Sequence, residues 1–338
     1  MNKASDGDTT QIAPGTYYEH DVNISKQLTV TGASAETTIV DGGQNGRVFV
    51  LLTHITLRHL TVQNGLSPDD PNLFVRSGGG VRVGTGAEVL IQHVIVRDNT
   101  ASGSGGGIYH YSVPGGAITI THSLIADNVN IVQFGGGIST GRPLTIRNSI
   151  IRNNQTTSGG IYTYNAAAVL DLERVTITDN RSASATGMFV STGVQAHLNN
   201  VTISDNVASN NYAGVQIAGA GAVVTVTNST IAYNSRTNAA GVGWNGIAAT
   251  SNGVAVVVNS IVAHNGERQC NTGDIISLGH NLSSDTYCDF TELGDLQNVN
   301  ALLLQTLAPT VTLRPQIQSN PSILSSAVNF RAYYVAIR

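Results

Sequence analysis

The sequence is poor in charged residues, in helix-forming residues and in aromatic side chains. Charged residues make up 11% of the 338 positions, against about 25% in typical soluble domains. Aromatic residues make up 5%, and the lysines are Lys3 and Lys26 alone. Such scarcity of Lys and Glu does not favour helices. A net charge of −4 without any basic cluster argues against nucleic acid as a partner.

Long apolar runs and extra cysteines are also missing. No run of 18 or more apolar residues is present, so we expect no membrane span. The first residues, MNKASDGD, are too polar for a signal peptide, so we expect either an intracellular protein or one whose signal has been removed. Cys270 and Cys288 lie 18 residues apart with no metal-binding spacing around them. A disulfide is favoured over two buried thiols, and it would indicate an oxidising compartment.

What the sequence does contain is a repeat, rich in β-branched residues, Asn and Gly. One copy reads ITITHSLIADN and ends at Asn128, and the next reads LTIRNSIIRNN. A small residue followed by Gly and an apolar residue recurs with a similar period, from Gly80-Val81 to Gly241-Val242. Two independent markers with one period indicate a solenoid. The repeats close on Asn99, Asn128, Asn154, Asn180, Asn206, Asn234 and Asn265, spaced 29, 26, 26, 26, 28 and 31 residues apart.

Each repeat contains short apolar–polar alternations, which predict about three short strands joined by bends. Stacked copies would pair in parallel around one apolar core. We therefore predict an all-β fold, a right-handed single-stranded parallel β-helix of about ten coils, over residues 1–266. Residues 267–338, where the repeat fades, are predicted to form a C-terminal capping segment of the same domain, because an open solenoid end exposes strand edges.

Two columns of residues fall at the predicted bends. The first holds mostly His and Asn, which tolerate the left-handed backbone conformation. Its members His59, His93 and His122 would stack, and three imidazoles in a row are a weak metal-site candidate that turn geometry explains better. The closing asparagines form a second candidate ladder, in which the side chains would hydrogen-bond along the axis.

Several stretches resemble a known group of proteins. The segment from DGDTTQIAPGTYYE to ISKQLTVTGASAETTIVDGG resembles the opening of pectin-lyase-like β-helix proteins. The GGGI and NSxIxxN markers resemble those of secreted bacterial repeat proteins of the polymorphic outer-membrane type. The tail SLGHNLSSDTYCDFTELGDLQN is similar to the end of such β-helices in surface proteins with varied anchors. The resemblance covers nearly the whole chain and implies an extracellular or cell-surface location, although no recognised anchor signal follows Ile323.

Many proteins of this superfamily are polysaccharide lyases, hydrolases or epimerases, but their signatures are missing. The polygalacturonase pattern needs an Arg-x-Lys that does not occur, and the pectate-lyase pattern is absent as well. Carboxylates could still pair on adjacent coils, as a glycosidase acid and base or around calcium. Capping of the turns explains these aspartates better. The weak catalytic candidates are Asp98, Asp127, Asp179 and Asp205.

An outward aromatic stripe gives the candidate glycan site. Residues directly after the Gly-apolar markers should point outward, and rings on neighbouring coils would form a flat platform for sugars. Arg82 could hold the carboxylate of an acidic sugar, since its planar fork matches that group. The alternative is that the tyrosines pack under loops or cover the core. The predicted glycan-binding residues are Arg82, Tyr109, Tyr111, Tyr162, Tyr164 and Phe189.

These observations favour a secreted or cell-surface β-helix that binds a polysaccharide or cell-surface glycan without catalysis. The alternatives are a lyase or hydrolase acting on an acidic polysaccharide, and a purely structural spacer or adhesin stalk. No cofactor is expected, with calcium as a candidate. Outward threonines such as Thr119 and Thr225 also recur, which ordinary strand preference explains. The oligomeric state is left open, although an uncapped N-terminal coil would favour end-to-end pairing.

Overall fold

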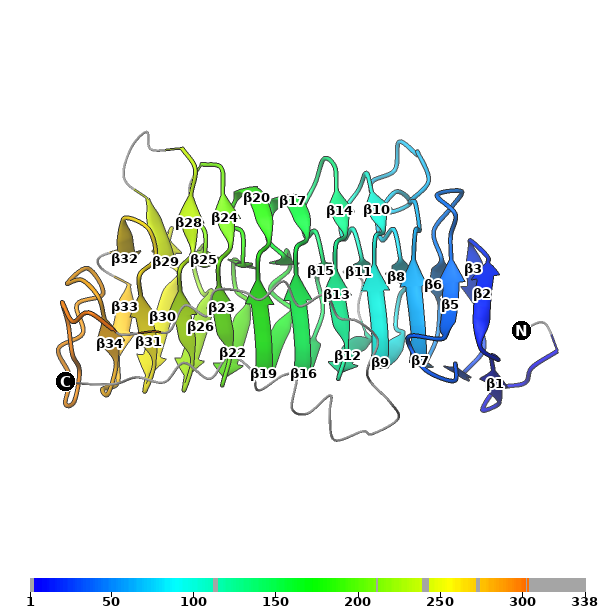
Figure 1. The fold of residues 1–338 in the computed structure, drawn as a ribbon, viewed down its shortest axis with the longest axis horizontal. Helices are drawn as coiled ribbons and strands as arrows, with labels where there is room; N and C mark the ends of the chain where they lie inside the picture. The colour runs from blue at the N-terminus through cyan, green and yellow to red at the C-terminus, as the bar shows by residue number, and fades with distance from the viewer. Residues whose placement is uncertain are drawn as a thin grey trace.

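The computed structural model describes residues 3–111, 115–210, 212–238, 243–271, 274–301 and 303. Its regular elements in this part of the chain are 34 strands and no helix, so no helix there could cross a membrane. Figure 1 shows a rod in which successive turns of the chain lie side by side. The predicted parallel β-solenoid is confirmed, with about nine turns instead of ten.

Three parallel sheets form the faces of the rod. Sheet A contains β1 (Thr9–Gln11), β2 (Gly15–Tyr18), β4 (Leu28–Thr31), β5 (Thr38–Asp41), β7 (Ile55–Gln63), β9 (Glu88–Arg97), β12 (Ala117–Thr121), β13 (Leu124–Ala126), β16 (Leu144–Arg152), β19 (Val169–Thr178), β22 (Gln195–Asn199), β23 (Thr202–Ser204), β26 (Val223–Thr227), β27 (Thr230–Ala232), β30 (Val254–Val258), β31 (Ile261–Ala263), β33 (Ile275–Ser277) and β34 (Leu282–Ser283). Sheet B contains β3 (Val22–Ile24), β6 (Phe49–Leu51), β8 (Val81–Val83), β11 (Ile108–His110), β15 (Ile138–Thr140), β18 (Ile161–Thr163), β21 (Met188–Ser191), β25 (Val215–Ala218), β29 (Trp244–Thr250) and β32 (Arg268–Cys270). Sheet C contains β10 (Thr100–Ala101), β14 (Val129–Asn130), β17 (Gln155–Ser158), β20 (Arg181–Ser184), β24 (Val207–Ala208) and β28 (Ser235–Arg236).

Strand alternation places one apolar column on another through the core. In β12, Ile118 and Ile120 are buried and pair with buried residues of β16, while Thr119 points outward. On sheet B the apolar residues of successive Gly-apolar markers pair with one another, from Val81 and Ile108 up to Val215. Val215 pairs with Ile247, so Gly246-Ile247 fills the position predicted for Gly241-Val242, which lies outside the described residues. The marker is therefore five positions later in the sequence than the repeat predicts.

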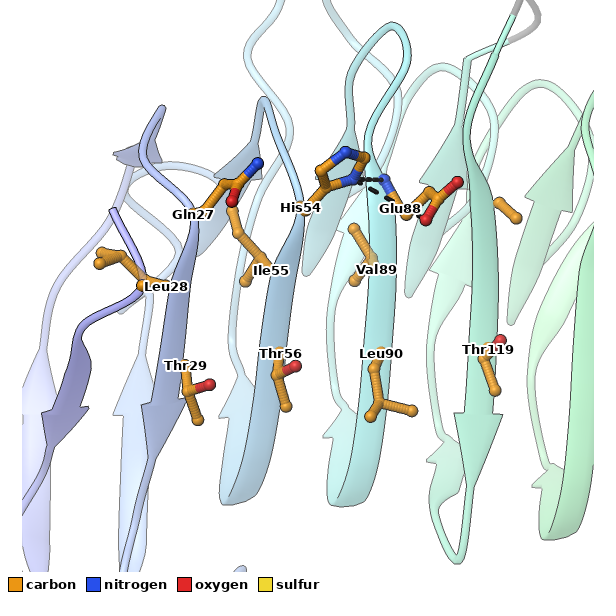
Figure 2. Close-up of a pocket in the computed structure, with 12 residues that line it drawn as sticks. Gln27, Leu28, Thr29, His54, Ile55, Thr56, Glu88, Val89, Leu90 and Thr119 are labelled. Carbon is orange, nitrogen blue, oxygen red and sulfur yellow. Dashed lines mark hydrogen bonds and ion pairs between the residues drawn. The ribbon is translucent and has the colours of Figure 1, made fainter. Parts of the chain in front are cut away.

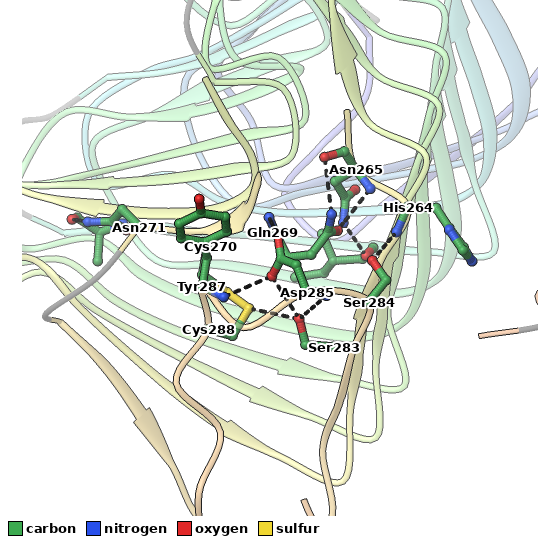
Figure 3. Close-up of a disulfide and its surroundings, with 12 residues drawn as sticks. His264, Asn265, Gln269, Cys270, Asn271, Ser283, Ser284, Asp285, Tyr287 and Cys288 are labelled. Atoms are coloured by element: carbon green, nitrogen blue, oxygen red, sulfur yellow. Dashed lines mark hydrogen bonds between the residues drawn. A yellow bond between two sulfur atoms is a disulfide. The ribbon is translucent and has the colours of Figure 1, made fainter. Parts of the chain in front are cut away.

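The closing asparagines form the predicted ladder inside the rod. Each is fully buried, and its Nδ2 donates to the Oδ1 of the next asparagine at 2.8–3.0 Å. The same Nδ2 also donates to a backbone carbonyl, as from Asn154 to Ile125. At the C-terminal end Asn265 donates instead to Gln269, at 2.9 Å (Figure 3). Every side-chain amide of this ladder is therefore paired, which a buried polar group requires.

Both bends require the left-handed backbone conformation. The first bend has φ of 47–56° at His59, His93, His122, Asn148, Arg174, Asn200, Asn228 and Asn259. The second bend precedes each closing asparagine. Its φ is 53–59° at Asn64, Asp98, Asp127, Asn153, Asp179, Asp205, Tyr233 and His264. Asn and Asp adopt this conformation with little strain because their short polar side chains can hydrogen-bond locally.

The solenoid continues past residue 266. Strands β32, β33 and β34 pair in parallel with β29, β30 and β31, so the segment predicted to cap the rod begins with a further coil. A disulfide joins Cys270 to Cys288 across this coil, with the Cα atoms 4.8 Å apart (Figure 3). Most of the apolar run from 301 to 307 lies outside the described residues.

Candidate functional site

The aromatic stripe on sheet B does not form a flat platform. Tyr162 stacks on Phe189 with ring centroids 4.7 Å apart, and Phe134 stacks on the other side of Tyr162 at 4.5 Å. The rings are nearly parallel, with interplanar angles of 14° and 11°. Their faces therefore cover one another along the rod axis and leave mainly ring edges to solvent. These rings therefore do not form the expected flat platform, and glycan binding by Tyr162 and Phe189 stays a prediction.

Tyr109 is also withdrawn from the surface. Only 3% of it is exposed, and burial raises the pKa of its phenol to about 12. Tyr164 lies parallel to it at 6.2 Å, and its hydroxyl donates to the His110 carbonyl at 2.7 Å and lies within hydrogen-bond distance of Tyr109 Oη, at 3.2 Å. The coil between them carries Ser139, which pairs with Tyr109 on one side and with Tyr162 on the other. These two tyrosines pack as the alternative reading expected.

Arg82 and Tyr111 keep some exposure on the same face. Arg82 of β8 lies directly beside Tyr109 in the sheet register. The Tyr111 N–H donates to the carbonyl of Val83, the residue after Arg82. The Tyr111 ring packs edge-on against Phe74, with centroids 4.5 Å apart. The structure thus brings Arg82, Tyr109 and Tyr111 together with Phe74, and places Tyr162 and Phe189 in a separate stack.

The four aspartates proposed as catalytic candidates all lie at the second bend, with φ of 55–59°. Asp127 accepts a hydrogen bond from Asn153 of the next coil, and Asp179 accepts one from Thr178 at 3.0 Å. Burial raises the pKa of Asp98; nearby Arg97 opposes this rise, and Asp127 adds to it. Their backbone conformation and local hydrogen bonds fit turn formation, and Asp205 occupies the same position in its own coil.

The three histidines of the first bend stack face to face. The ring centroids of His59 and His93 are 5.0 Å apart, and those of His93 and His122 are 4.9 Å apart. Burial lowers the pKa of His93, and the neighbouring His122 and His59 lower it further. Parallel rings point their nitrogens sideways and not at a common centre. Within the described residues no group of three or more His, Cys, Asp or Glu side chains is arranged to hold a metal.

The outer face of sheet A carries a shallow groove of about 490 Å³ (Figure 2). It crosses β4, β7, β9 and β12, and one outward column supplies Thr29, Thr56, Leu90 and Thr119. The three threonine hydroxyls make no hydrogen bond to another described residue. The remaining lining residues are Gly7, Gln27, Leu28, His54, Ile55, Glu88, Val89 and Ala117.

His54 and Glu88 stand together at one rim of the groove (Figure 2). The backbone N–H of Glu88 donates to His54 Nδ1 at 3.2 Å, and the Glu88 carboxylate lies 4.0 Å from the same nitrogen. A neutral His54 with an occupied Nδ1 carries its proton on Nε2. The rim can therefore offer a ring N–H donor and a carboxylate acceptor to a hydroxylated ligand.

The sequence reasoning named Thr119 as one of the outward threonines, but it assigned none of the groove residues to a binding site. Thr29 and Thr56 lie 27 residues apart, which matches the repeat, so their outward column could have been followed back from Thr119. His54 and Glu88 precede the apolar alternation of their strands and belong to neither marker. Only the three-dimensional register shows that they are neighbours.

A family model described as "right handed beta helix region" matches residues 48–231, which is 184 of the 338 residues. The chain belongs to this right-handed β-helix family. No curated protein sequence matches it. Among solved structures, the Dettilon tailspike protein is 14% identical with a TM-score of 0.45, covering 86% of this chain and 61% of that chain.

Two further structures resemble this β-helix. A mannuronic acid specific polysaccharide family 6 lyase from human gut microbiota is 11% identical, with a TM-score of 0.34 over 87% of this chain and 86% of that chain. The A-module of a mannuronan C-5 epimerase from Azotobacter vinelandii is 16% identical, with a TM-score of 0.28 over 86% and 85%. At these identities the likeness concerns the fold. The chain spans 61% of the tailspike's length.

Proposed function

We propose that this β-helix binds an extended glycan chain in the groove on sheet A without cleaving it. The groove itself is the observation that carries the proposal. It crosses four neighbouring strands, which lie about 4.8 Å apart. It therefore runs roughly 15 Å along the rod, a shape that suits a linear polymer better than a compact small molecule.

The chemistry of the groove also suits sugars. Hydroxyls of Thr29, Thr56 and Thr119 repeat along it, with the apolar side chain of Leu90 between them. Sugar rings present hydroxyls at their edges and C–H groups on their faces, so both kinds of surface find a partner. A hydroxyl side chain can donate or accept a hydrogen bond, so each threonine can pair with a sugar hydroxyl in either direction.

Binding without cleavage is favoured because Glu88 is the one carboxylate among the twelve lining residues. Glycosidases typically need two carboxyl groups across the scissile bond. The aspartate candidates, including Asp98 and Asp127, are not among the groove residues. An extracellular or cell-surface location belongs to the proposal, because the Cys270–Cys288 disulfide fits an oxidising compartment.

A polysaccharide panel, run with and without calcium, tests the proposal. Retention and new reducing ends or unsaturated products are measured in parallel. Thr119→Arg places a long side chain in the groove and should weaken retention at least about tenfold, or about 1.4 kcal/mol. Thr225→Arg is the matched control, because Thr225 points outward in the same column of sheet A but does not line the groove.

Retention lost in Thr119→Arg and kept in Thr225→Arg would support the groove. Products that disappear in Asp98→Asn or Asp127→Asn would instead establish a lyase or hydrolase. Neither retention nor products across the panel would refute glycan binding and leave a structural spacer as the better account.

A further inference from the structure

A second surface, on sheet B, combines positive charge with exposed apolar side chains. Between β7 and β8 the chain forms a loop, residues 66–77, that reaches the outer side of sheet B, where Phe74 packs on Tyr111 at 4.5 Å. Arg82 is half-buried beside this contact, next to Tyr109 in the sheet register. The arginine and the two aromatic residues come from β8, the end of β11 and the loop, so three separate segments meet here.

The loop is fixed in place by a buried arginine. Arg47 is 3% exposed, and its Nε donates to the Gly78 carbonyl at 2.6 Å. Its Nη2 donates to the carbonyls of Ser77 at 2.9 Å and Val75 at 2.5 Å. Hydrogen bonds from one guanidinium to three backbone carbonyls within residues 75–78 hold the end of the loop against the rod. The position of Phe74 is thereby tied to the scaffold.

This region carries positive charge that no carboxylate pairs with. Burial lowers the pKa of Arg47 to about 10, and repulsion from Arg82 contributes to the decrease, while Asp21 opposes it. The sheet register agrees with this, because Val50 of β6, three residues after Arg47, pairs with Arg82 of β8. No ion pair between described residues involves Arg47 or Arg82. The buried Nε of Arg82 also has no hydrogen-bond partner in the described structure. An anion bound here would relieve the repulsion.

The apolar side of the surface lies within the same loop. Leu73 is 45% exposed and Phe74 is 40% exposed, so two large apolar side chains lie next to each other on the surface of the loop. Phe74 covers one part of Tyr111 and leaves its own outer side free. In the same loop Asp70 accepts a hydrogen bond from the Asn72 N–H at 2.7 Å and so caps its own turn. The surface thus offers a cation and apolar contact area side by side.

We infer that Arg82, Tyr111 and Phe74 form a subsite for an acidic sugar, in which Arg82 binds the carboxylate and the two rings contact the sugar C–H groups. A guanidinium binds a carboxylate through two parallel hydrogen bonds, which fixes the orientation of the sugar. The subsite lies on sheet B and does not depend on the groove of sheet A. The subsite adds Phe74 to the predicted glycan-binding residues Arg82 and Tyr111. The buried Tyr109 lies next to Arg82 in the sheet register.

Saturation-transfer NMR with sodium glucuronate and with glucose, at fixed ionic strength, tests the subsite. Glucuronate should bind and glucose should bind at least about tenfold more weakly, since charge-assisted hydrogen bonds are roughly twice as strong as neutral ones. Arg82→Gln should abolish the preference. Arg82→Lys should keep part of it, because lysine keeps the charge and loses the planar fork. Phe74→Ala changes an exposed side chain and should weaken glucuronate about threefold through lost contact area.

Two control variants make the result specific. Arg152→Gln removes a half-buried arginine from sheet A and should change nothing. Thr119→Arg blocks the groove and should leave glucuronate binding intact, so failure of the groove proposal is distinguishable from failure of the subsite. Equal binding of glucose and glucuronate would overturn the inference. Loss of glucuronate in Thr119→Arg but not in Arg82→Gln would overturn it as well.

Discussion

A buried histidine should make this β-helix sensitive to mild acid. His110 in β11 is fully buried, with Nδ1 3.4 Å from Thr140 Oγ1 and with no hydrogen-bond partner for Nε2 in the described structure. Burial, and then the charge of Arg142, lower its pKa from 6.5 to about 4. The folded protein therefore holds this imidazole neutral at pH values where the unfolded chain takes up a proton.

The sign and size of the effect follow from this difference. Well above pH 6.5 the imidazole is neutral in both the folded and the unfolded protein, so protonation of His110 takes nothing from the free energy of unfolding. As the pH falls, the unfolded chain gains a proton that the folded protein refuses until about pH 4. Each pKa unit corresponds to about 1.36 kcal/mol, so His110 should lower the free energy of unfolding by about 2 kcal/mol at pH 5.

Urea unfolding of the wild type and of His110→Val at pH 7.5 and pH 5 measures this contribution. Valine is the matched replacement because Val83 occupies the same column on the preceding coil. Between pH 7.5 and pH 5 the free energy of unfolding should fall by about 2 kcal/mol less in the variant than in the wild type. Comparing the two proteins cancels the effect of carboxylates, which both share. His197→Gln, an exposed change on sheet A, is the control. Identical pH dependence of wild type and His110→Val would refute the reasoning.

Three further results are expected. Asn154→Leu removes the acceptor of both the Asn128 N–H and its Nδ2, and should cost about 3 kcal/mol in urea unfolding; an unchanged midpoint would contradict the ladder's role. Changing both Cys270 and Cys288 to Ser opens a loop spanning 18 residues and should cost about 3 kcal/mol, seen as faster hydrogen exchange in β32–β34 alone; uniform exchange along the rod would argue against a local effect. His93→Asn keeps a residue suited to φ of 52°. Since the pKa of His93 is lowered in the folded protein, the variant should be as stable as the wild type at pH 7.5 and more stable at pH 5. A variant more sensitive to acid than the wild type would contradict this.

The repeat was enough to predict the fold because each marker has a single structural cause. An asparagine such as Asn154 recurs once per coil since its buried amide must reach the equivalent amide of the next coil, and a different position within the coil would leave it unpaired. The bends are equally readable, because few residues other than Gly, Asn, Asp and His accept a positive φ. The last marker was misplaced because Val215 and its partner Ile247 are separated by five residues more than the preceding pair of markers, and extra residues change the spacing without changing the register.

The candidate site was harder to predict because alternation gives the direction of a side chain and not its tilt. Tyr162 and Phe189 do leave sheet B on adjacent coils, as expected. Coils rise by about 4.8 Å, which is close to the 4.7 Å between these two rings. Aromatic residues in one column therefore stack along the axis, and their faces are used within the protein. The contact between Phe74 and Tyr111 joins a loop to a distant strand, which no local pattern encodes.

The outer faces of sheets A and B differ in how far their outward side chains are available to a ligand. Long side chains reach their neighbours on the next coil, so the rings of Tyr162 and Phe189 use their faces to contact each other. Threonine side chains are too short to cover their neighbours, so the column through Thr29, Thr56 and Thr119 keeps its hydroxyls available beside the apolar surface of Leu90. A regular array of unused hydroxyls on a rigid sheet costs little conformational entropy when a ligand binds. For that reason the groove on sheet A is a stronger candidate than the aromatic stripe, even though aromatic residues are the more conspicuous feature of the sequence.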